Sequence, residues 1–426
     1  MSHSVFIKSA RLFSPEHPLH RQVVDMLVVD GKLKEIGENL MSSGHEYLDM
    51  TGYWVSAGWI DPFGVCPEPG EPWKETIVSY TKAAQMGGFT DVYALAGSSP
   101  KPDNESVIAQ VKQMGMNQRA TLHPLGLATV NGEGKEMAEV AEMAAVGATA
   151  FCDGLHPSAS AGLRQKLMQY CNSLGLLFLS YPLNKSLSAD GKVHEGTVNL
   201  HLGMKGISTI AETIELSVDL HLAQYNQTEL RSIGISAAES VQMISAAKKA
   251  GMLVKAAVPV LNLFAVDEDV LGFDENLKVL PPIRSEKDRA SLRQSVIDGV
   301  IDAVFSNHHP EDVESKKVEF DYSAWGAATL SYMFPMMLDS LGEELLDSWL
   351  PILTKKNAEF IGVKPNEISV GADATFTFFS TSETTEITGP QKNGSIAWNV
   401  PFIGKKLLGR VKGTMIHSCY MEVKHV

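Results

Sequence analysis

Short runs of alternating polar and apolar residues make up the start of the chain, and turn signals such as Ser14-Pro15 and Asp30-Gly31 separate them. Because successive side chains on a strand point to opposite faces, this alternation is typical of half-buried β-strands. The pattern therefore predicts an all-β start. The expected strands are Ser4–Phe13, Val23–Val29, Lys32–Ile36 and Glu46–Val55.

From Gly58 onward, apolar strand-like runs alternate with amphipathic helical segments. Several of the segments end in the glycine expected just past a helix C-terminus. Eight strand–helix units over roughly 300 residues predict an α/β fold of the TIM (β/α)8 barrel type. A doubly wound open sheet is the alternative. The expected strands are Gly58–Asp61, Thr90–Ala94, Ala120–Gly126, Ala148–Cys152, Leu176–Tyr181, Leu230–Ile235, Leu253–Val258 and Ala303–Ser306. The expected helices are Ile77–Met86, Ser106–Met114, Glu136–Ala145, Leu163–Leu174, Ile207–Ala223, Ser240–Ala250 and Ala290–Asp298.

After the barrel pattern, Gly326–Gly362 has helical character, and strand-like runs return at Val370–Phe379 and Leu407–Val423. Late strands that match the early ones predict a small β-sandwich domain built by both chain ends. We expect residues 1–55 and 366–426 to form this composite domain and residues 56–365 to form the barrel.

Composition narrows the class of protein. The 426 residues exceed the usual single-domain range of roughly 100–200 residues, which agrees with a barrel plus a smaller module. The net charge of −14 argues against a nucleic-acid-binding surface, because such surfaces need clustered Lys and Arg. No apolar run approaches the roughly 18 residues that span a membrane. The four cysteines are scattered, and the N-terminus does not have the pattern of a signal peptide, so we expect a cytoplasmic protein.

A set of motifs connects the chain with a known family. In Ser56–Gly70, apolar residues run into Asp61 and are followed by a Pro-Glu-Pro-Gly turn, and Lys74-Glu75-Thr76 comes shortly afterwards. Together with Gly87-Gly88-Phe89-Thr90 and Pro281-Pro282-Ile283-Arg284, this pattern resembles the dihydroorotases of the amidohydrolase superfamily over almost the whole chain. The resemblance implies a TIM barrel with a β-sandwich and, in an active member, zinc-dependent hydrolysis of a cyclic amide.

The strand of this family that begins the metal site ends in Asp-x-His-x-His, and here Phe63 and Val65 stand at the two histidine positions. Residues i and i+2 of a strand point the same way, so His-x-His presents two imidazoles to one zinc. Phe63 and Val65 have no donor atom. Cys66 could bind zinc, but its side chain points to the opposite face of the strand from that of Val65.

The resemblance pairs Tyr181 and Gly234 with the family's two further metal-binding histidines. Asp153 corresponds to one carboxylate ligand that the chain has kept. The family's catalytic base, an Asp, corresponds to Asn307, and a side-chain amide has no protonation step near neutral pH with which to accept a proton. The resemblance therefore implies that no metal site and no catalytic base of the family type remain.

The positions that hold the substrate in the family have changed as well. The Arg that binds the substrate carboxylate corresponds to Pro67, and an Asn of the substrate site corresponds to Gly97. A second Asn, before the Pro-Pro dipeptide, corresponds to Leu280. An enzyme with a new substrate would be expected to keep its metal, whereas here the metal ligands and the anion-binding residues are both replaced.

Four residues are candidates for a residual pocket or metal site, namely Asp61, Asp153, His308 and His309. A strong zinc site needs three or four convergent donors. The alternative is that the two aspartates accept hydrogen bonds at strand ends and that His308 packs beneath the loops. We also expect Phe63 and Tyr181 to fill the vacated space, because buried voids are costly. The remaining histidines considered, which show no metal-binding spacing, are His123, His156, His201 and His221.

Three functions follow as hypotheses. The first is a catalytically inactive dihydroorotase-like protein of pyrimidine biosynthesis that needs no cofactor and works as an assembly partner; the resemblance implies aspartate transcarbamoylase as its partner and a homodimer as its state. The second is an active hydrolase that binds Zn through Asp153, His308 and one further group. The third is a small-molecule sensor that uses the emptied pocket. None of the three involves nucleic acid or a membrane.

Overall fold

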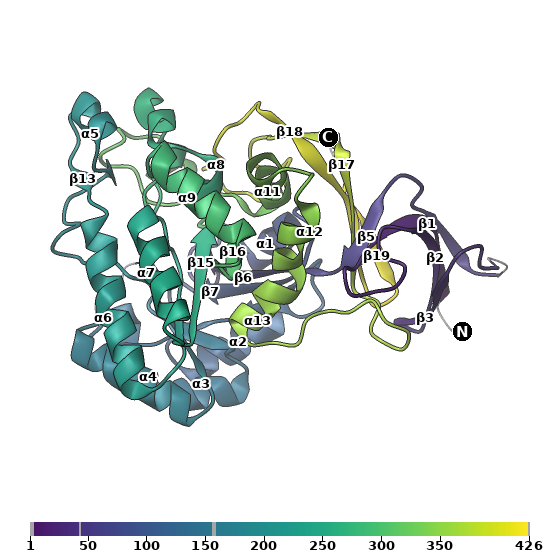
Figure 1. Cartoon of the computed structure of the whole chain (residues 1–426), viewed down its shortest axis with the longest axis horizontal. Coiled ribbons are helices and arrows are strands. Elements are labelled where there is room, and N and C mark those ends of the chain that lie inside the picture. Colours follow the sequence, from purple (N-terminus) through teal and green to yellow (C-terminus); the bar gives the residue numbers. More distant parts are fainter. Residues whose placement is uncertain (1–3, 42–43, 156–158, 425–426) are drawn as a thin grey trace.

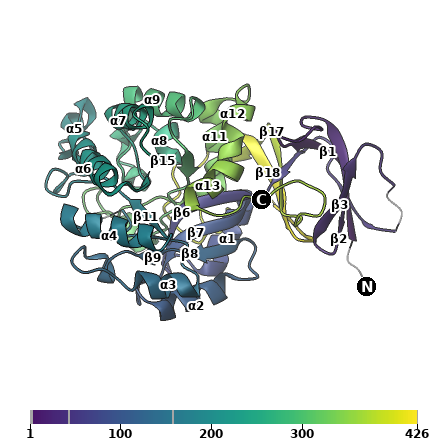
Figure 2. The same cartoon turned by 60° about the horizontal axis from the view of Figure 1, so that its bottom comes forward.

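The structure is a computed structural model that describes residues 4–41, 44–155 and 159–424. Its larger part is a barrel of parallel strands surrounded by helices, and its smaller part is a sheet built from both ends of the chain (Figure 1). The turned view in Figure 2 shows the same division, with β1, β2 and β3 beside β17 and β18 at one end of the molecule. Within the described residues, we find no helix with the length and apolar character needed to cross a bilayer.

The barrel strands form two parallel sheets that continue into one another. The first has the order β6-β7-β8 and the second has the order β16-β15-β14-β11-β10-β9. The strands are β6 (Trp59–Cys66), β7 (Phe89–Ala96), β8 (Thr121–Pro124), β9 (Gly126–Leu127), β10 (Ala150–Cys152), β11 (Leu177–Ser180), β14 (Leu230–Ser232), β15 (Val254–Pro259) and β16 (Ala303–Phe305).

Two connections close the barrel. Strands β8 and β9 lie on either side of Leu125 in one continuous segment, which carries the first sheet into the second. At the other junction, the Val65 N–H donates to the His308 carbonyl at 2.8 Å, so β6 lies beside the segment that follows β16. The predicted TIM barrel is confirmed. Several expected boundaries were wrong. Strand β6 extends beyond Asp61 to Cys66 and so includes Phe63 and Val65, and the expected strand Glu46–Val55 is divided into β4 and β5.

The helices that surround the strands begin at capping residues. The side chains of Thr76, Asn104, Ser160 and Ser285 each accept a hydrogen bond from a backbone N–H in the first helical turn, which satisfies a donor that has no partner within the helix. The longer helices of the barrel are α1 (Ile77–Met86), α2 (Glu105–Gly115), α3 (Val140–Val146), α4 (Ala161–Ser173), α6 (Ile210–Asn226), α7 (Ala238–Lys249) and α9 (Glu286–Ile297). A helix from Glu136 was expected. It begins instead at Val140, because the preceding segment bridges to Thr129 through Met137.

Shorter elements complete the barrel and lead out of it. Near the barrel they are η1 (Val130–Gly132), β12 (Val193–His194), α5 (Thr197–Leu202), β13 (Gly206–Ile207), α8 (Val260–Phe264), η2 (Asp267–Gly272), η3 (Glu275–Leu277) and α10 (Val313–Lys316). The segment expected to be helical after the barrel contains η4 (Leu330–Tyr332), α11 (Met333–Leu341), α12 (Leu346–Pro351), η5 (Ile352–Lys356) and α13 (Asn357–Ile361).

The smaller part is an eight-stranded sheet in the order β19-β18-β17-β5-β1-β2-β3, with β4 paired to β1. Strands from the two ends of the chain meet where β5 pairs with β17. Val5, Met26, Phe376 and Met415 belong to the apolar core that the sheet encloses. Its strands are β1 (Ser4–Phe13), β2 (Val23–Val29), β3 (Lys32–Gly37), β4 (Glu46–Asp49), β5 (Trp54–Ala57), β17 (Phe376–Glu386), β18 (Lys406–Ile416) and β19 (Cys419–Glu422). The predicted fold class, a barrel with a β-sandwich formed by both chain ends, is confirmed, whereas the domain boundaries at 55/56 and 365/366 stay a prediction.

Candidate functional site

The carboxyl ends of parallel barrel strands form the face on which this architecture builds its active sites. In this chain an apolar cluster reaches that face from the barrel interior. Phe63, Tyr181, Leu280 and Phe305 are buried members of the cluster, and Trp325 packs against it from the loop after β16. The resemblance pairs Phe63 and Tyr181 with metal-binding histidines and Leu280 with a substrate-binding Asn. The mouth of the barrel is therefore continuous with its hydrophobic core.

Phe63 lies fully buried on β6, and its ring meets the ring of Phe305 edge-to-face with centroids 5.6 Å apart. Aromatic pairs prefer this arrangement because the positive edge of one ring faces the negative face of the other. Val65 is half-buried on the same strand, and its neighbour Cys66 is buried in a different cluster, which also contains Tyr80 of α1. The Cys66 thiol therefore lies apart from the cluster that contains Phe63.

Tyr181 and Gly234 are in direct contact across the mouth. A Cβ atom at position 234 would overlap with the Cε2 and Cδ2 atoms of the Tyr181 ring. Gly234 also has φ +75°, a conformation that favours glycine. Burial raises the pKa of the Tyr181 hydroxyl well above its ordinary value, so this group stays protonated near neutral pH. The tyrosine ring thus fills the space that a side chain at position 234 would need.

Asp61 is fully buried at the junction of β6 and β16. Its carboxyl accepts the Ser306 N–H at 2.9 Å and the Ser306 hydroxyl at 2.5 Å. Burial raises the pKa of Asp61 to about 7, and the hydrogen bonds from Ser306 oppose that rise. Both carboxyl oxygens are thereby used in joining β6 to the end of β16.

Asp153 follows β10 and binds the neighbouring loop. Its two oxygens accept the Thr129 N–H and the Thr129 hydroxyl, each at 2.9 Å. Burial raises the pKa of Asp153, while the bonds from Thr129 lower it. The carboxylate that the resemblance pairs with a metal ligand therefore has a hydrogen-bond donor on each oxygen.

Asn307 has φ +52°, and its side-chain amide donates to the Leu280 carbonyl at 2.9 Å. Asparagine tolerates this left-handed backbone region better than most residues. Asn307, which the resemblance pairs with the family's catalytic base, thus holds Leu280 in place. The resemblance pairs Leu280 with a substrate-binding Asn. The side chain acts as a structural donor between two loops at the mouth.

His308 is buried. Its Nδ1 accepts the Thr329 N–H at 3.2 Å, and its Nε2 lies 3.6 Å from the Glu75 carboxylate. The ring meets that of Tyr80 edge-to-face at 5.1 Å. His309 is more exposed, and its Nε2 lies 3.9 Å from Glu311. The two histidines are thus directed to different carboxylates.

A zinc ion at the family position does not fit the residues present. Phe63, Val65 and Gly234 offer no donor atom, and the ring of Tyr181 fills the space beside Gly234. Across residues 4–41, 44–155 and 159–424, no three His, Cys, Asp or Glu side chains form a group that could hold a metal ion. Asp61, Asp153, His308 and His309 are not brought together in such a group.

The other positions singled out from the sequence lie in loops or on helices, except His123, which lies on β8. The Pro67 carbonyl accepts the Ser98 hydroxyl at 3.1 Å. Gly97 has φ +115°, and a Cβ there would approach the Pro100 carbonyl to 2.8 Å. His201 and His221 are exposed on helices, and His123 pairs with Asp91 at 2.9 Å. His156 lies outside the described residues.

A buried polar network beside the mouth was not anticipated. The Arg284 guanidinium donates to the Ile207 carbonyl at 2.7 Å and to the Ser236 hydroxyl at 3.0 Å, and it lies 3.5 Å from Glu212. Burial and the charge of Arg284 lower the pKa of His194 to about 4, so that imidazole is neutral near neutral pH. The Pro-Pro-Ile-Arg motif that ends in Arg284 was the sequence signal that could have indicated this network.

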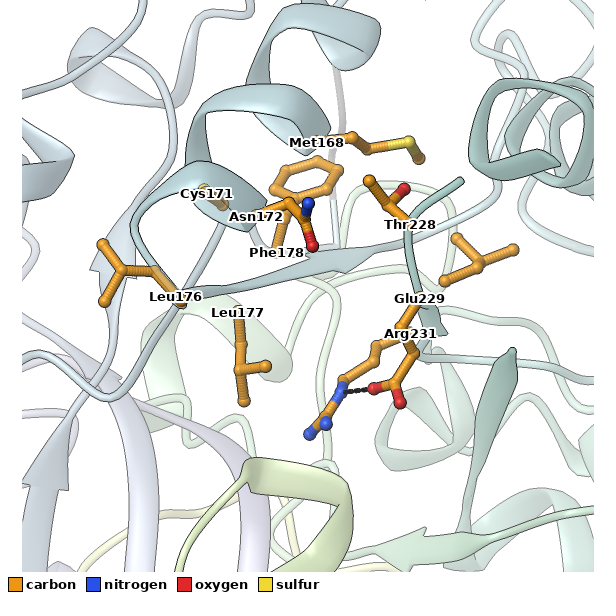
Figure 3. Close-up of a pocket in the computed structure, with 11 residues that line it drawn as sticks. Met168, Cys171, Asn172, Leu176, Leu177, Phe178, Thr228, Glu229 and Arg231 are labelled. Atoms are coloured by element: carbon orange, nitrogen blue, oxygen red, sulfur yellow. Dashed lines mark hydrogen bonds and ion pairs between the residues drawn. The ribbon is translucent and has the colours of Figure 1, made fainter. Parts of the chain in front are cut away.

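The described part of the chain has a pocket at each end of the barrel. At the mouth, a pocket of about 250 Å³ is lined by Leu280, Trp325 and Ile207 and by the loop after β11. At the opposite end, a pocket of about 250 Å³ lies between α4 and the starts of β11 and β14 (Figure 3). There, Arg231 pairs with Glu229 on one side, and Met168 lies on the other.

Comparison with known proteins identifies the family. Residues 58–240 match the family described as dihydro-orotase-like. A dihydroorotase from Pelotomaculum thermopropionicum is 35% identical over 395 residues, covering 92% of each chain. A dihydroorotase from Syntrophus aciditrophicus is 32% identical over 421 residues, covering 97% of this chain and 98% of the relative.

Solved structures share the fold along nearly the full length. An L-hydantoinase (dihydropyrimidinase) from Arthrobacter aurescens superimposes with a TM-score of 0.85 at 20% identity, covering 99% of this chain and 96% of the other. A dihydropyrimidinase from Brevibacillus agri gives a TM-score of 0.79 at 19% identity, with coverage of 99% and 95%. On the evidence of the full-length relatives, the chain belongs to the dihydroorotase family.

Proposed function

We propose that this member of the dihydroorotase family is catalytically inactive and works through assembly with another protein of pyrimidine biosynthesis. The observation that carries the proposal is the contact between Tyr181 and Gly234. Two positions that the resemblance pairs with metal-binding histidines are occupied by a ring and by the glycine that makes room for it. Histidine cannot replace Gly234 unless the Tyr181 ring moves away.

The rest of the mouth supports the proposal. Phe63 joins the apolar core, and Asn307 holds the Leu280 carbonyl. Metal-assisted hydrolysis needs a metal-bound water and a group that takes its proton. Asp61 and Asp153 are engaged with Ser306 and Thr129, so neither carboxyl is directed to a shared centre. The groups that ring opening requires are therefore not assembled here.

The assembly partner that we propose is aspartate transcarbamoylase, and the chain itself is proposed to be a homodimer. The test is to mix the purified chain with the transcarbamoylase of the same organism and to follow both in size-exclusion chromatography with light scattering. Co-elution at a mass that accounts for both proteins supports the proposal. Separate elution at concentrations well above those in the cell contradicts it. A dihydroorotase from another organism serves as the negative control.

A further inference from the structure

A further pocket lies where the sheet meets the helical segments that lead out of the barrel. It is bounded by the turn of residues 14–18 after β1, by the junction of α12 with η5 and by the segment of residues 365–369. Its volume of about 430 Å³ exceeds that of the pocket at either end of the barrel. Sites for small molecules commonly have volumes of about 300–1,000 Å³ and often lie between two structural units. The size and place of this pocket therefore suit a small ligand.

Most of the lining surface of this pocket is apolar. All three boundaries contribute proline, and Ile368 adds a branched apolar side chain. Because the pyrrolidine ring fixes φ, prolines limit the conformations that the walls can adopt. The prolines are Pro15, Pro18, Pro351 and Pro365. The lining therefore offers rigid apolar contact on several sides.

Polar contacts hold the walls of the pocket in place. The Glu16 carboxylate lies 2.5 Å from the Lys355 ammonium, which joins the turn after β1 to η5. The side-chain amide of Asn366 donates to the Gly58 carbonyl at 3.3 Å, which joins the third boundary to the start of the barrel. Because the walls are joined before a ligand arrives, binding does not have to order them.

The charged side chains of the lining already have partners. Glu16 and Lys355 pair with each other, and the Glu367 carboxylate lies 3.9 Å from the Lys364 ammonium. An ion bound here would lose hydration without gaining an unpaired counter-charge, and that loss costs free energy. The pocket therefore favours an uncharged ligand.

His17 supplies a directed polar group. It lines the pocket and is half-buried, and its Nδ1 accepts the Leu19 N–H at 3.1 Å. A neutral imidazole whose Nδ1 is an acceptor carries its proton on Nε2. The second nitrogen is therefore a hydrogen-bond donor, and a carbonyl oxygen is a matching acceptor.

We propose that this pocket binds a small uncharged molecule that carries an apolar ring and a carbonyl oxygen. The ring lies against the prolines and Ile368, and the oxygen accepts the N–H of His17 Nε2. A mostly apolar lining with few polar groups matches such a ligand, because the apolar walls supply contact area and the polar group fixes the orientation. The proposal depends neither on the assembly role nor on the barrel mouth.

The experiment is equilibrium dialysis of the full chain with methyl naphthyl ketone, followed by ultraviolet absorbance. Naphthalene carries the ring without the carbonyl, and naphthoate carries the ring with a negative charge. Thr354→Trp places a large side chain in the pocket, and Thr213→Trp is the matched control at a half-buried position on α6 outside it. His17→Phe keeps a ring and removes the donor, and His201→Phe is its control on the surface of α5.

We expect saturable binding of the ketone to the wild-type chain, to Thr213→Trp and to His201→Phe. The affinity should fall by more than about tenfold in Thr354→Trp and by about fivefold in His17→Phe, whereas naphthalene should bind wild type and His17→Phe equally. Naphthoate should bind wild type more weakly than the ketone does.

Four results would contradict the proposal. The absence of saturable ketone binding to the wild-type chain would overturn the site. Equal ketone affinity in Thr354→Trp and Thr213→Trp would place the ligand elsewhere. An unchanged ketone affinity in His17→Phe, or a loss that naphthalene shares, would overturn the hydrogen bond to the carbonyl. Naphthoate binding as tightly as the ketone would overturn the preference for an uncharged ligand.

Discussion

The ring of Tyr181 lies against Gly234 so closely that a Cβ atom on residue 234 would overlap with it. Gly234→Ala should therefore lower the free energy of unfolding by about 1–3 kcal/mol through overpacking, in addition to the cost of its left-handed backbone. Gly299→Ala is the matched control, because Gly299 has φ +72° and a Cβ atom on it would meet nothing within 4 Å. Urea denaturation of both variants measures the difference.

The same contact predicts non-additivity. In a Tyr181→Ala background the ring is gone, so Gly234→Ala should cost no more than Gly299→Ala does. A penalty at position 234 that is unchanged by the loss of the ring would show that the two residues do not compete for space.

Phe63→His should destabilise the protein more than Val65→His. Phe63 is fully buried against Phe305, so its replacement loses aromatic packing and buries an imidazole, at a cost of about 2–4 kcal/mol. Val65 is half-buried, so Val65→His should lower the free energy of unfolding by less. The double variant should not bind zinc stoichiometrically, because Tyr181 and Gly234 supply no nitrogen ligands. Metal analysis after dialysis checks this, and one tightly bound zinc per chain would contradict it.

Asn307→Asp should not create dihydroorotate turnover. At neutral pH it should lower the free energy of unfolding by about 1–3 kcal/mol, because a carboxylate oxygen would face the Leu280 carbonyl in place of an amide donor. The loss should shrink as the pH falls, since a protonated carboxyl can donate. Asparagine and aspartate both tolerate φ +52°, so the backbone is not the cause. Urea denaturation at several pH values measures the effect, and a loss that does not change with pH would contradict the stated cause.

Asp61 should make stability depend on pH. Burial raises its pKa from the ordinary value of 3.8 to about 7, so the folded state binds this proton more tightly than the unfolded state does. The contribution of Asp61 is therefore greatest below about pH 4, falls as the pH rises to about 7 and is level above that.

Asp61→Asn cannot titrate and keeps an acceptor for the Ser306 N–H. From about pH 5 to about pH 8, the difference in unfolding free energy should shift in favour of the variant. All other titrating groups are common to the two proteins, so the difference isolates Asp61. A constant difference over that range would show that the buried carboxyl is ionised throughout.

The sequence predicted the fold well, because strand and helix periods and terminal glycines are local signals. The predicted end of the strand that contains Asp61 was too early. It continues to Cys66 because its later residues pair with β7, and a partner strand cannot be seen in a short stretch of sequence.

The site was predictable in residue identity but not in contacts. The motif comparison located Tyr181, Gly234 and Asn307. Tyr181 contacts Gly234, and Asn307 binds Leu280. Both contacts depend on loops that meet only in the folded barrel.

The decisive measurement is the rate of dihydroorotate ring opening and closure by the purified chain supplied with zinc, beside an active dihydroorotase as the control. We predict no rate above buffer, because Phe63 and Tyr181, which stand at positions that the resemblance pairs with metal ligands, are packed into the apolar core. A zinc-dependent rate that a chelator abolishes would contradict catalytic inactivity and would mean that a metal site is built from other residues.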